Sequence, residues 1–349
     1  MELFNMFQIG DKKIAQSEPA YIIAEIGVNH NGDMELAKKS IAKAAEIGAD
    51  AVKFQTFNSK KLVSKYAAKA KYQTQNTSSE ESQLDMLKKL ELSYDDHIVL
   101  KNYCEQLGIE FLSTPFDTDS AKFLNDIGVH AFKIGSGDLT NIPLLEEIST
   151  YKRPVLLSTG MANLTEVEEA LEALKGTETA ILHCTSNYPT PVEDVNLRVM
   201  NTMEQAFGKI VGYSDHTLGY EVTVAAVTLG AKVIEKHFTL DRDLPGPDHK
   251  ASMNPEEFAE LVQAIRNVEE SLGDGIKRCM PSEEDTKSVA RKSLVAIADL
   301  KPGDVLTEEN LTVKRPGTGI PPKYFSLLIG KTVKNEVKED NVLTWNDVL

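Results

Sequence analysis

Short apolar runs alternate with amphipathic stretches from about residue 21 to residue 267 of this chain. Strands that alternate with helical patterns are typical of βαβ units built on a parallel sheet. The runs predict strands at Tyr21–Val28, Ala51–Gln55, Glu110–Ser113, Ala131–Ile134, Val155–Ser158, Ala180–His183, Ile210–Tyr213 and Lys232–Phe238. Eight such units within roughly 250 residues predict an α/β fold of the (β/α)8 TIM-barrel type.

The stretches between these runs predict helices with recognisable starts. Asp33–Ile47 begins with an aspartate cap, Leu164–Leu174 follows Asn163, and Leu218–Leu229 separates the last two strands. The segment from Ser59 to Glu80 is too long for an ordinary strand-to-helix loop and carries several lysines. We interpret this segment as an active-site flap, with a solvated excursion as the alternative.

The pattern changes after about Gly273, where long alternating units give way to short segments and turns. We therefore predict a barrel domain at residues 1–280, a linker at 281–291 and a small domain at 292–349. About 60 residues give only a marginal core. The small domain is expected to pack against its own barrel or against a partner subunit.

Composition and charge narrow the class of protein. The 349 residues carry a formal net charge of −15, which argues against nucleic acid and anionic membranes as partners. Cys104, Cys184 and Cys279 are scattered and fit a reducing compartment. The first residues lack the pattern of a secretory signal, and no apolar run reaches transmembrane length. We expect a cytoplasmic chain.

Two histidines follow consecutive predicted strands, in the strings Gly212–His216 and Val233–Phe238. Parallel neighbouring strands bring both imidazoles to the same edge of the barrel. A two-histidine metal site at His216 and His237 with open positions is one interpretation. A pair of hydrogen-bonded core histidines is the other.

Lys53 and Lys133 lie within predicted strands of an otherwise apolar barrel. A buried lysine is costly unless it meets an anion. With Ser136, Ser158, Ser186 and Ser214 at the same rim, the two lysines indicate a phosphate or carboxylate site. Alternatively, the lysines reach out of the barrel or pair with Glu25. Residue type alone leaves open whether Glu25 pairs with a lysine, transfers protons or binds a hydroxyl, and whether Asp248 binds substrate or only shapes a turn.

An ordered set of strings resembles the N-acetylneuraminate (sialic acid) synthase family, including the legionaminic acid synthases. The strings are Ala24–His30, Val52–Thr56, Ser113–Phe116, Phe132–Gly137, Leu157–Met161, His183–Thr185, Tyr188–Pro191, Tyr213–Thr217, Glu235–Thr239, Gly246–Asp248 and Lys314–Gly317. The resemblance implies a TIM barrel followed by a small C-terminal antifreeze-like (SAF) domain. It also implies a domain-swapped homodimer in which the small domain caps the partner's barrel.

The same resemblance implies roles for individual residues. His216 and His237 would bind Mn²⁺ or Mg²⁺. Lys53, Thr114, Lys133, Ser136, Ser158 and Ser214 would hold the phosphate and carboxylate of phosphoenolpyruvate. Glu25, Gln55, Tyr188 and Asp248 would address the sugar or the water ligands of the metal, and Arg315 of the other subunit would reach the N-acyl group. Whether Ser186 or Asn187 faces the site stays open.

The implied reaction condenses phosphoenolpyruvate with N-acetylmannosamine and water to give N-acetylneuraminate and phosphate, with cleavage of a C–O bond. A legionaminic acid synthase that uses 2,4-diacetamido-2,4,6-trideoxymannose is the alternative. A non-catalytic sugar-binding protein is a third hypothesis, which predicts an incomplete set of catalytic groups.

Overall fold

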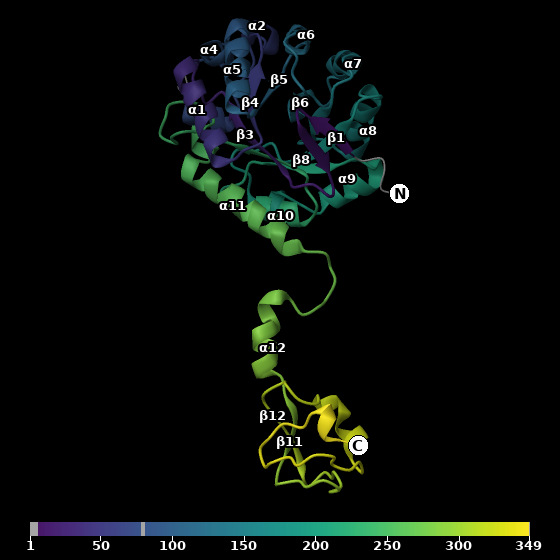
Figure 1. Cartoon of the computed structure of the whole chain (residues 1–349). Coiled ribbons are helices and arrows are strands. Elements are labelled where there is room, and N and C mark those ends of the chain that lie inside the picture. Colours follow the sequence, from purple (N-terminus) through teal and green to yellow (C-terminus); the bar gives the residue numbers. More distant parts are fainter. Residues whose placement is uncertain (1–5, 78–80, 349) are drawn as a thin grey trace. The chain divides into compact units, whose positions relative to one another are not determined.

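The computed structural model describes residues 6–77 and 81–348 and divides into two compact units, Met1–Gly273 and Asp274–Leu349 (Figure 1). The first unit contains the predicted barrel and the second contains the short segments of the C-terminal region. None of the described helices is long and apolar enough to cross a lipid bilayer.

A parallel sheet of eight strands forms the centre of the first unit within the described residues. The hydrogen-bonded order is β5-β4-β3-β10-β9-β8-β7-β6, and β5 also contacts β6, so the barrel is nearly closed. This confirms the predicted fold class. The strands are β3 (Tyr21–Gly27), β4 (Ala51–Thr56), β5 (Glu110–Pro115), β6 (Phe132–Ile134), β7 (Val155–Ser158), β8 (Thr179–Cys184), β9 (Val211–Asp215) and β10 (Val233–His237).

Two of the helices predicted from the sequence, α1 (Met34–Ile47) and α8 (Leu164–Ala173), begin at their expected caps, Asp33 and Asn163. Asp33 caps α1 by accepting bonds from the backbone of Glu35 and Leu36. The other covering helices are α5 (Tyr94–Leu107), α6 (Thr118–Asp126), α7 (Ile142–Thr150), α9 (Val199–Phe207), α10 (Glu221–Thr228) and α11 (Pro255–Leu272). The prediction for α10 was wrong at its start, because Gly219 has a φ of 72° and residues 218–220 form a turn.

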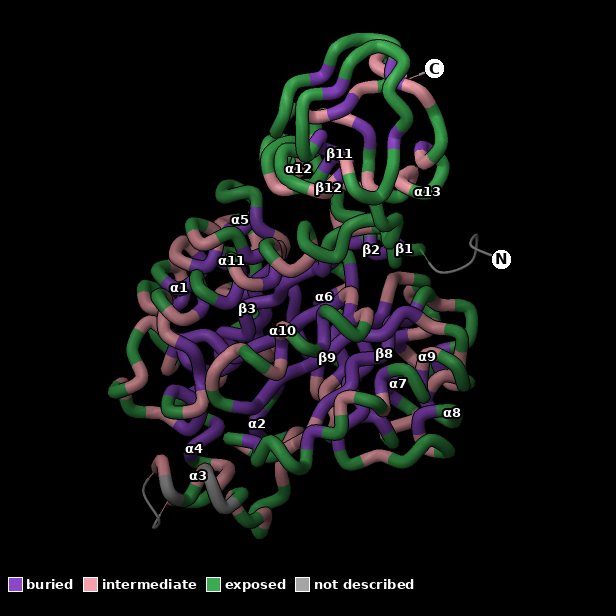
Figure 2. Tube along the Cα trace, turned by 90° about the horizontal axis from the view of Figure 1, so that it is seen from below, coloured by how far each residue is buried: buried purple, intermediate pink, exposed green. Residues whose placement is uncertain are grey.

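Two layers of apolar side chains fill the barrel unit, and buried residues follow the strands in Figure 2. The larger layer lies between the strands and the helices. The smaller layer fills the inside of the barrel and includes Phe7, Ile9 and Ile14. These three residues belong to an antiparallel hairpin, β1 (Met6–Ile9) and β2 (Lys12–Ala15), which the sequence analysis did not predict. The hairpin packs with Tyr21, the first residue of β3, at the N-terminal end of the strands.

The long segment after β4 forms three short helices: α2 (Ser59–Leu62), α3 (Lys71–Asn76) and α4 (Gln83–Leu90). Ser82 caps α4 by accepting a bond from the backbone of Asp85. Part of the segment predicted as a flap, residues 78–80, lies outside the described residues.

The C-terminal unit has a core of its own, which includes Leu294, Ile320 and Leu343. Strands β11 (Ser293–Ala296) and β12 (Leu311–Lys314) pair antiparallel, and α13 (Phe325–Leu328) follows them. Residues 281–290, assigned above to a linker, form a 3₁₀ turn and α12 (Glu284–Ala290).

Candidate active site

A cavity of about 490 Å³ opens at the C-terminal ends of the barrel strands. Every site residue predicted in the barrel lines it: Glu25, Lys53, Gln55, Thr114, Lys133, Ser136, Ser158, Ser186, Tyr188, Ser214, His216, His237 and Asp248. Strand alternation explains this convergence, because residues two apart on a strand point to the same face. The barrel therefore brings together side chains that are more than 200 residues apart in the sequence.

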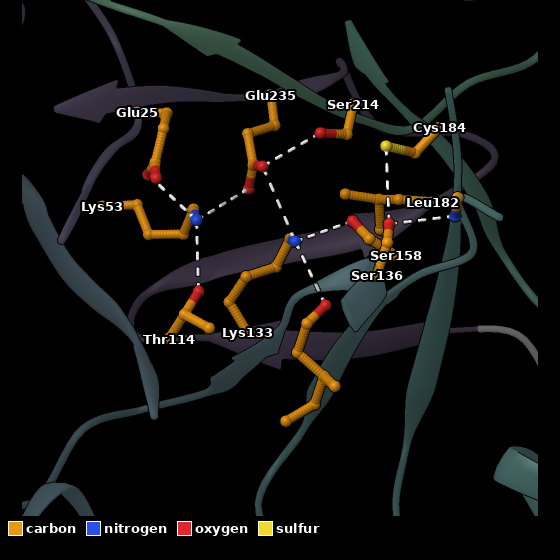
Figure 3. Close-up of polar contacts among 12 residues, drawn as sticks. Glu25, Lys53, Thr114, Lys133, Ser136, Ser158, Leu182, Cys184, Ser214 and Glu235 are labelled. Atoms are coloured by element: carbon orange, nitrogen blue, oxygen red, sulfur yellow. Dashed lines mark hydrogen bonds and ion pairs between the residues drawn. The ribbon is translucent and has the colours of Figure 1, made fainter. Parts of the chain in front are cut away.

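Two lysines and two glutamates form the polar floor of this cavity, and we call Glu25, Lys53, Lys133 and Glu235 the inner cluster (Figure 3). Lys53 Nζ lies 2.9 Å from Glu25 Oε2 and 3.8 Å from Glu235 Oε2. Lys133 Nζ lies 3.6 Å from Glu235 Oε1. The cluster is buried and its pairs with Glu235 are long, and the Oε2 atom of Glu235 has no hydrogen-bond partner among the described groups.

Hydroxyl groups complete the surroundings of the two lysines. Lys53 Nζ donates to Thr114 Oγ1 at 3.2 Å, and Lys133 Nζ donates to Ser158 Oγ at 2.7 Å. Ser214 Oγ donates to Glu235 Oε1 at 3.0 Å. These are the groups that the sequence analysis assigned to an anion site, and the structure brings them within reach of one another.

Glu235 is a site residue that the sequence analysis missed. It precedes His237 by two positions on β10, so the alternation of a strand points both side chains into the barrel. The signal was therefore present in the string that the two-histidine hypothesis used. The sequence analysis assigned a role to His237 but none to the Glu235 carboxylate on the same face of the strand.

The two carboxylates of the inner cluster differ in their electrostatics. Burial would raise the pKa of Glu235, but the charges of Lys133 and Lys53 outweigh it and hold the pKa below its usual range. Burial raises the pKa of Glu25 more than Lys53 lowers it, and the charge of Glu235 adds to the increase. Glu235 is thus the fixed anion, whereas Glu25 holds a proton more readily.

Ser136 and Ser186 meet above the backbone of Gly160. Ser136 Oγ accepts a hydrogen bond of 2.9 Å from the nitrogen of Gly160. A Cβ atom on Gly160 would collide with the hydroxyl groups of both serines. The glycine therefore permits the close approach of β6, β7 and β8 loops that places Ser186 on the cavity wall.

His216 and His237 lie side by side, with ring centroids 5.5 Å apart. Tyr188 packs against both rings, at 4.1 Å from His216 and 5.6 Å from His237. His216 Nδ1 bonds to the carbonyl oxygen of Thr185 at 2.8 Å, which leaves Nε2 as the nitrogen available to a ligand. The two rings thus lie close enough to act together.

The chemistry of His237 fits a metal ligand, whereas at His216 burial lowers the pKa but Cys184 and the Thr185 carbonyl outweigh it and raise the pKa. His237 Nδ1 is buried and, among the described residues, has no hydrogen-bond partner. Burial, with the adjacent His216, lowers the pKa of His237 well below its usual value, so its ring stays neutral, the form that binds metals. Within the described residues no group of three or more His, Cys, Asp or Glu side chains is arranged to hold a metal, and the two-histidine site stays a prediction.

Asp248 closes the cavity from the loop after β10. Its Oδ1 atom is buried without a partner among the described groups, and burial raises the pKa of this carboxyl to about 6. The neighbouring Pro247 carbonyl accepts a hydrogen bond of 2.8 Å from Asn76 at the end of α3. This bond joins the segment after β4 to the loop after β10, and Leu62, Val63 and Gln73 line the cavity, as the flap interpretation expects.

A second buried ion pair lies on the opposite face of the same strands, and we call Asp215 and Lys236 the outer pair. Lys236 Nζ lies 2.7 Å from Asp215 Oδ2 and donates to the Thr217 carbonyl at 2.7 Å. Asp215 also accepts bonds from Tyr213, Thr217 and Thr223. The pair joins β9 to β10 directly beside the two histidines.

His30 and His183 take structural roles. His30 Nδ1 accepts a bond from the backbone nitrogen of Gly32, and His183 bonds to the Val195 carbonyl. Arg315 belongs to the C-terminal unit, where it follows β12 and is exposed. Its predicted role toward the N-acyl group stays a prediction.

Comparison with known proteins decides the family. A model described as the NeuB family matches residues 40–277, and a SAF domain model matches residues 291–349. The chain belongs to the NeuB family. It is 49% identical over 327 residues to an N,N'-diacetyllegionaminic acid synthase of Campylobacter jejuni, which covers 92% of this chain and 98% of that protein.

Two further relatives span most of this NeuB-family chain. It is 39% identical over 340 residues to a human N-acetylneuraminate-9-phosphate synthase, covering 95% of this chain and 93% of that one. A crystal structure of a sialic acid synthetase from Leptospira borgpetersenii, in complex with citrate, superposes with a TM-score of 0.72 at 35% identity. It covers 81% of this chain and 96% of that one. These matches confirm the sequence-based family assignment and the SAF domain.

Proposed function

We propose that this protein condenses phosphoenolpyruvate with an open-chain N-acylated hexosamine and water, giving a nine-carbon sialic acid-type sugar and phosphate. The observation that carries the proposal is the inner cluster. Two buried lysines point into the same cavity as five serine and threonine residues, next to two adjacent histidines. Relatives named as synthases of sialic acid-type sugars support this reaction.

The lysine side of the cavity suits the doubly anionic substrate. Lys53 and Lys133, with Thr114, Ser136, Ser158 and Ser214, would hold the phosphate and carboxylate of phosphoenolpyruvate. Charge-assisted hydrogen bonds from lysine to phosphate are stronger than bonds between neutral groups. Burial lowers the pKa of Lys133 despite the charge of Glu235, whereas for Lys53 the charges of Glu235 and Glu25 outweigh burial and raise the pKa.

His216 and His237 would hold the divalent cation, Mn²⁺ or Mg²⁺, through their free ring nitrogens. A bound cation of this kind polarises the aldehyde oxygen of the acceptor as a Lewis acid. The hydrogen bond from His216 to Thr185 fixes the orientation of that ring, and Tyr188 holds both rings from one side.

The condensation forms a C–C bond between carbon three of phosphoenolpyruvate and the aldehyde carbon, leaving positive charge on carbon two. Glu25, and Glu235 beside it, stabilise that charge from the floor of the cavity. Water then adds to carbon two and loses a proton, which balances the proton taken up by the alkoxide oxygen formed from the aldehyde. The resulting tetrahedral centre expels phosphate by breaking the C–O bond, while Lys53 and Lys133 stabilise the departing anion.

Gln55, Tyr188 and Asp248 would bind the acceptor sugar. Gln55 Nε2 donates to Glu25 Oε1 at 3.2 Å, so its amide oxygen remains free to accept a bond from a sugar hydroxyl. N-acetylmannosamine is the acceptor implied by the family resemblance, and the diacetamido-trideoxy sugar is the alternative favoured by the Campylobacter relative.

We further infer a domain-swapped homodimer in the cytoplasm. The exposed Arg315 of the SAF domain would then reach the N-acyl group in the partner's barrel. The family resemblance implies this arrangement, and the compact core of the small domain would let it act as a rigid cap. Cross-linking and light scattering of the intact protein would test the dimer.

The reaction is tested by release of phosphate. Purified protein is incubated with Mn²⁺, phosphoenolpyruvate and either acceptor, with omission of each component as the control. Phosphate is expected only when metal, phosphoenolpyruvate and an acceptor are all present. Absence of phosphate with both acceptors would reject the enzyme and favour a sugar-binding protein.

His237→Ala tests the metal assignment. Removing one of two protein ligands should weaken Mn²⁺ affinity about 100-fold or more, since even the loss of a supporting group costs about 10–100-fold. Mn²⁺ binding is measured by electron paramagnetic resonance, with His183→Ala as the control for loss of a neighbouring histidine. Unchanged affinity in His237→Ala would refute the assignment.

A further inference from the structure

Each of the two histidines at the cavity is directly preceded in the sequence by one member of the outer pair. Asp215, the last residue of β9, precedes His216, and Lys236 precedes His237 on β10. The register of β9 against β10 makes Asp215 and Lys236 direct neighbours, and both are buried. The ion pair therefore joins the two strands at the positions from which the histidines enter the cavity.

The ammonium group of Lys236 contacts the chain on both sides of His216. Its Nζ atom lies 2.7 Å from Asp215 Oδ2 and donates to the Thr217 carbonyl oxygen at 2.7 Å. The backbone nitrogen of Thr217 donates to Asp215 Oδ1 at 2.8 Å. Because His216 lies between Asp215 and Thr217 in the chain, its backbone is held on both sides by groups bonded to one another. One ammonium group thus fixes the backbone of His216 relative to that of His237.

The remaining polar contacts of the two histidines lead to different loops. The ring of His216 bonds to the Thr185 carbonyl, and its own carbonyl accepts a bond of 2.8 Å from the nitrogen of Thr190. The carbonyl of His237 accepts a bond of 2.9 Å from the nitrogen of Met253. His216 is thereby anchored to the loop after β8, and His237 to the loop after β10. The outer pair is a side-chain link between these two anchored positions.

We propose that Asp215 and Lys236 are positioning residues for the cation site, and that their ion pair holds His216 and His237 at the separation a divalent metal requires. This inference rests on the function proposed above, in which the two histidines hold the cation. Neither member of the pair is among the described residues that line the cavity, so both act through the backbone of the histidines. With two protein ligands, affinity depends on how well both ring nitrogens are placed before the metal binds.

A purely structural role for the outer pair predicts a different result. If the pair only stabilised the fold, a variant that is less stable but still folded would bind Mn²⁺ as tightly as the wild type. If the pair positions the histidines, affinity should fall about 10–100-fold, as it does when groups that orient metal ligands are removed. The two roles are therefore separated by measuring affinity and stability on the same variants.

A second ion pair in the same barrel provides the matched control. Arg266 Nη2 lies 3.2 Å from Asp50 Oδ2, and Asp50 directly precedes β4 at the end of the barrel opposite to the cavity. Arg266→Met removes the cation of this pair at a distance from both histidines. This variant should lose stability and retain wild-type affinity for Mn²⁺.

The experiment titrates Mn²⁺ into metal-free protein and follows binding by electron paramagnetic resonance. The proteins are wild type, Lys236→Met, the Asp215→Asn, Lys236→Met double variant and Arg266→Met, with folding checked by circular dichroism. Affinity should fall about 10–100-fold in both outer-pair variants. The double variant should show this loss even where it recovers stability, and it provides the measurement if Lys236→Met does not fold. Calorimetric affinity for phosphoenolpyruvate should be retained in the folded double variant.

Loss of Mn²⁺ affinity in the outer-pair variants, with retention in Arg266→Met, supports the proposal. Wild-type affinity in the folded double variant overturns it, as does an equal loss in Arg266→Met or an equal loss of phosphoenolpyruvate affinity in the double variant. These three outcomes leave the synthase function intact when the wild type binds Mn²⁺ and releases phosphate. A wild type that binds no Mn²⁺ overturns the two-histidine cation site of the proposed function, and the positioning role with it.

Discussion

The inner cluster and the outer pair are both buried lysine–carboxylate groups on the same barrel, but they differ in how completely their atoms are paired. In the outer pair, Lys236 and Asp215 are 2.7 Å apart, and three further groups donate to the carboxylate. In the inner cluster, Glu235 lies 3.6–3.8 Å from its two lysines, and its Oε2 atom has no hydrogen-bond partner among the described groups.

We infer from this difference that the outer pair holds the fold and that the inner cluster would bind a ligand. A buried pair that satisfies all its atoms stabilises the backbone around it, whereas an incompletely satisfied cluster is costly until a ligand completes it. Strand alternation alone separates the two: Glu235 points inward and Lys236, the next residue, points outward. The outer pair would fix the strand ends that carry the histidines, and the inner cluster would receive the substrate anion.

The largest expected effect is on stability, at the outer pair. Lys236→Met leaves the Asp215 carboxylate buried without its cation and should lower the free energy of unfolding by about 3–5 kcal/mol. Asp215→Asn combined with Lys236→Met removes the stranded charge and should recover part of that loss. Denaturant unfolding followed by circular dichroism measures both, and an unchanged midpoint in Lys236→Met would contradict the comparison.

At the inner cluster, we expect a smaller loss in the free energy of unfolding but a large loss of activity. Lys133→Met removes one cation from the departing phosphate and should lower kcat about 100- to 1,000-fold, as loss of one preorganised donor does. Stability should fall less than in Lys236→Met, because Glu235 keeps Lys53 and Ser214 as partners. Phosphate release and unfolding are measured on the same preparation. If Lys133→Met unfolds more readily than Lys236→Met yet retains activity, the roles assigned to the inner cluster and the outer pair are reversed.

The smallest effect concerns pH and Glu25. Burial raises the pKa of Glu25 in the folded protein, so its contribution to stability is present at low pH and lost as pH rises through the folded pKa. Glu25→Gln removes this dependence. In metal-free protein, its stability relative to wild type should therefore rise from pH 5 to pH 8, by on the order of 1–3 kcal/mol, since one pKa unit corresponds to about 1.4 kcal/mol. If the stability of Glu25→Gln relative to wild type stays constant or falls as pH rises, the pKa of Glu25 is not raised by folding.

The sequence predicted the barrel because β-branched runs and helix caps are local signals, and the eight strands lie where those runs are. The hairpin β1–β2 was not predicted, although Gly10 and Asp11 mark its turn, because its strands have only four residues each. The polar groups of the site could be predicted from their positions at strand ends. Glu235 could have been predicted as well, because it lies two residues before His237 and therefore on the same face of β10.

The apolar residues that line the cavity and the outer pair could not be predicted in the same way. Val28 and Leu87 come from segments far apart in the sequence, and only the folded chain shows that both line one cavity. Likewise, the pairing of Asp215 with Lys236 depends on the register of β9 against β10, in which these two residues are direct neighbours. Local patterns predict elements, whereas these features depend on how the elements pack.

The inner cluster, and not the outer pair, is proposed to bind the substrate anion. Calorimetric titration of phosphoenolpyruvate into wild type, Lys133→Met and the Asp215→Asn, Lys236→Met double variant tests it directly. Binding should weaken by about 10-fold or more in Lys133→Met, since a charge-assisted bond contributes roughly 1.5–3 kcal/mol, and should be retained in the folded double variant. Wild-type affinity in Lys133→Met, or equal loss in the double variant, would contradict the claim.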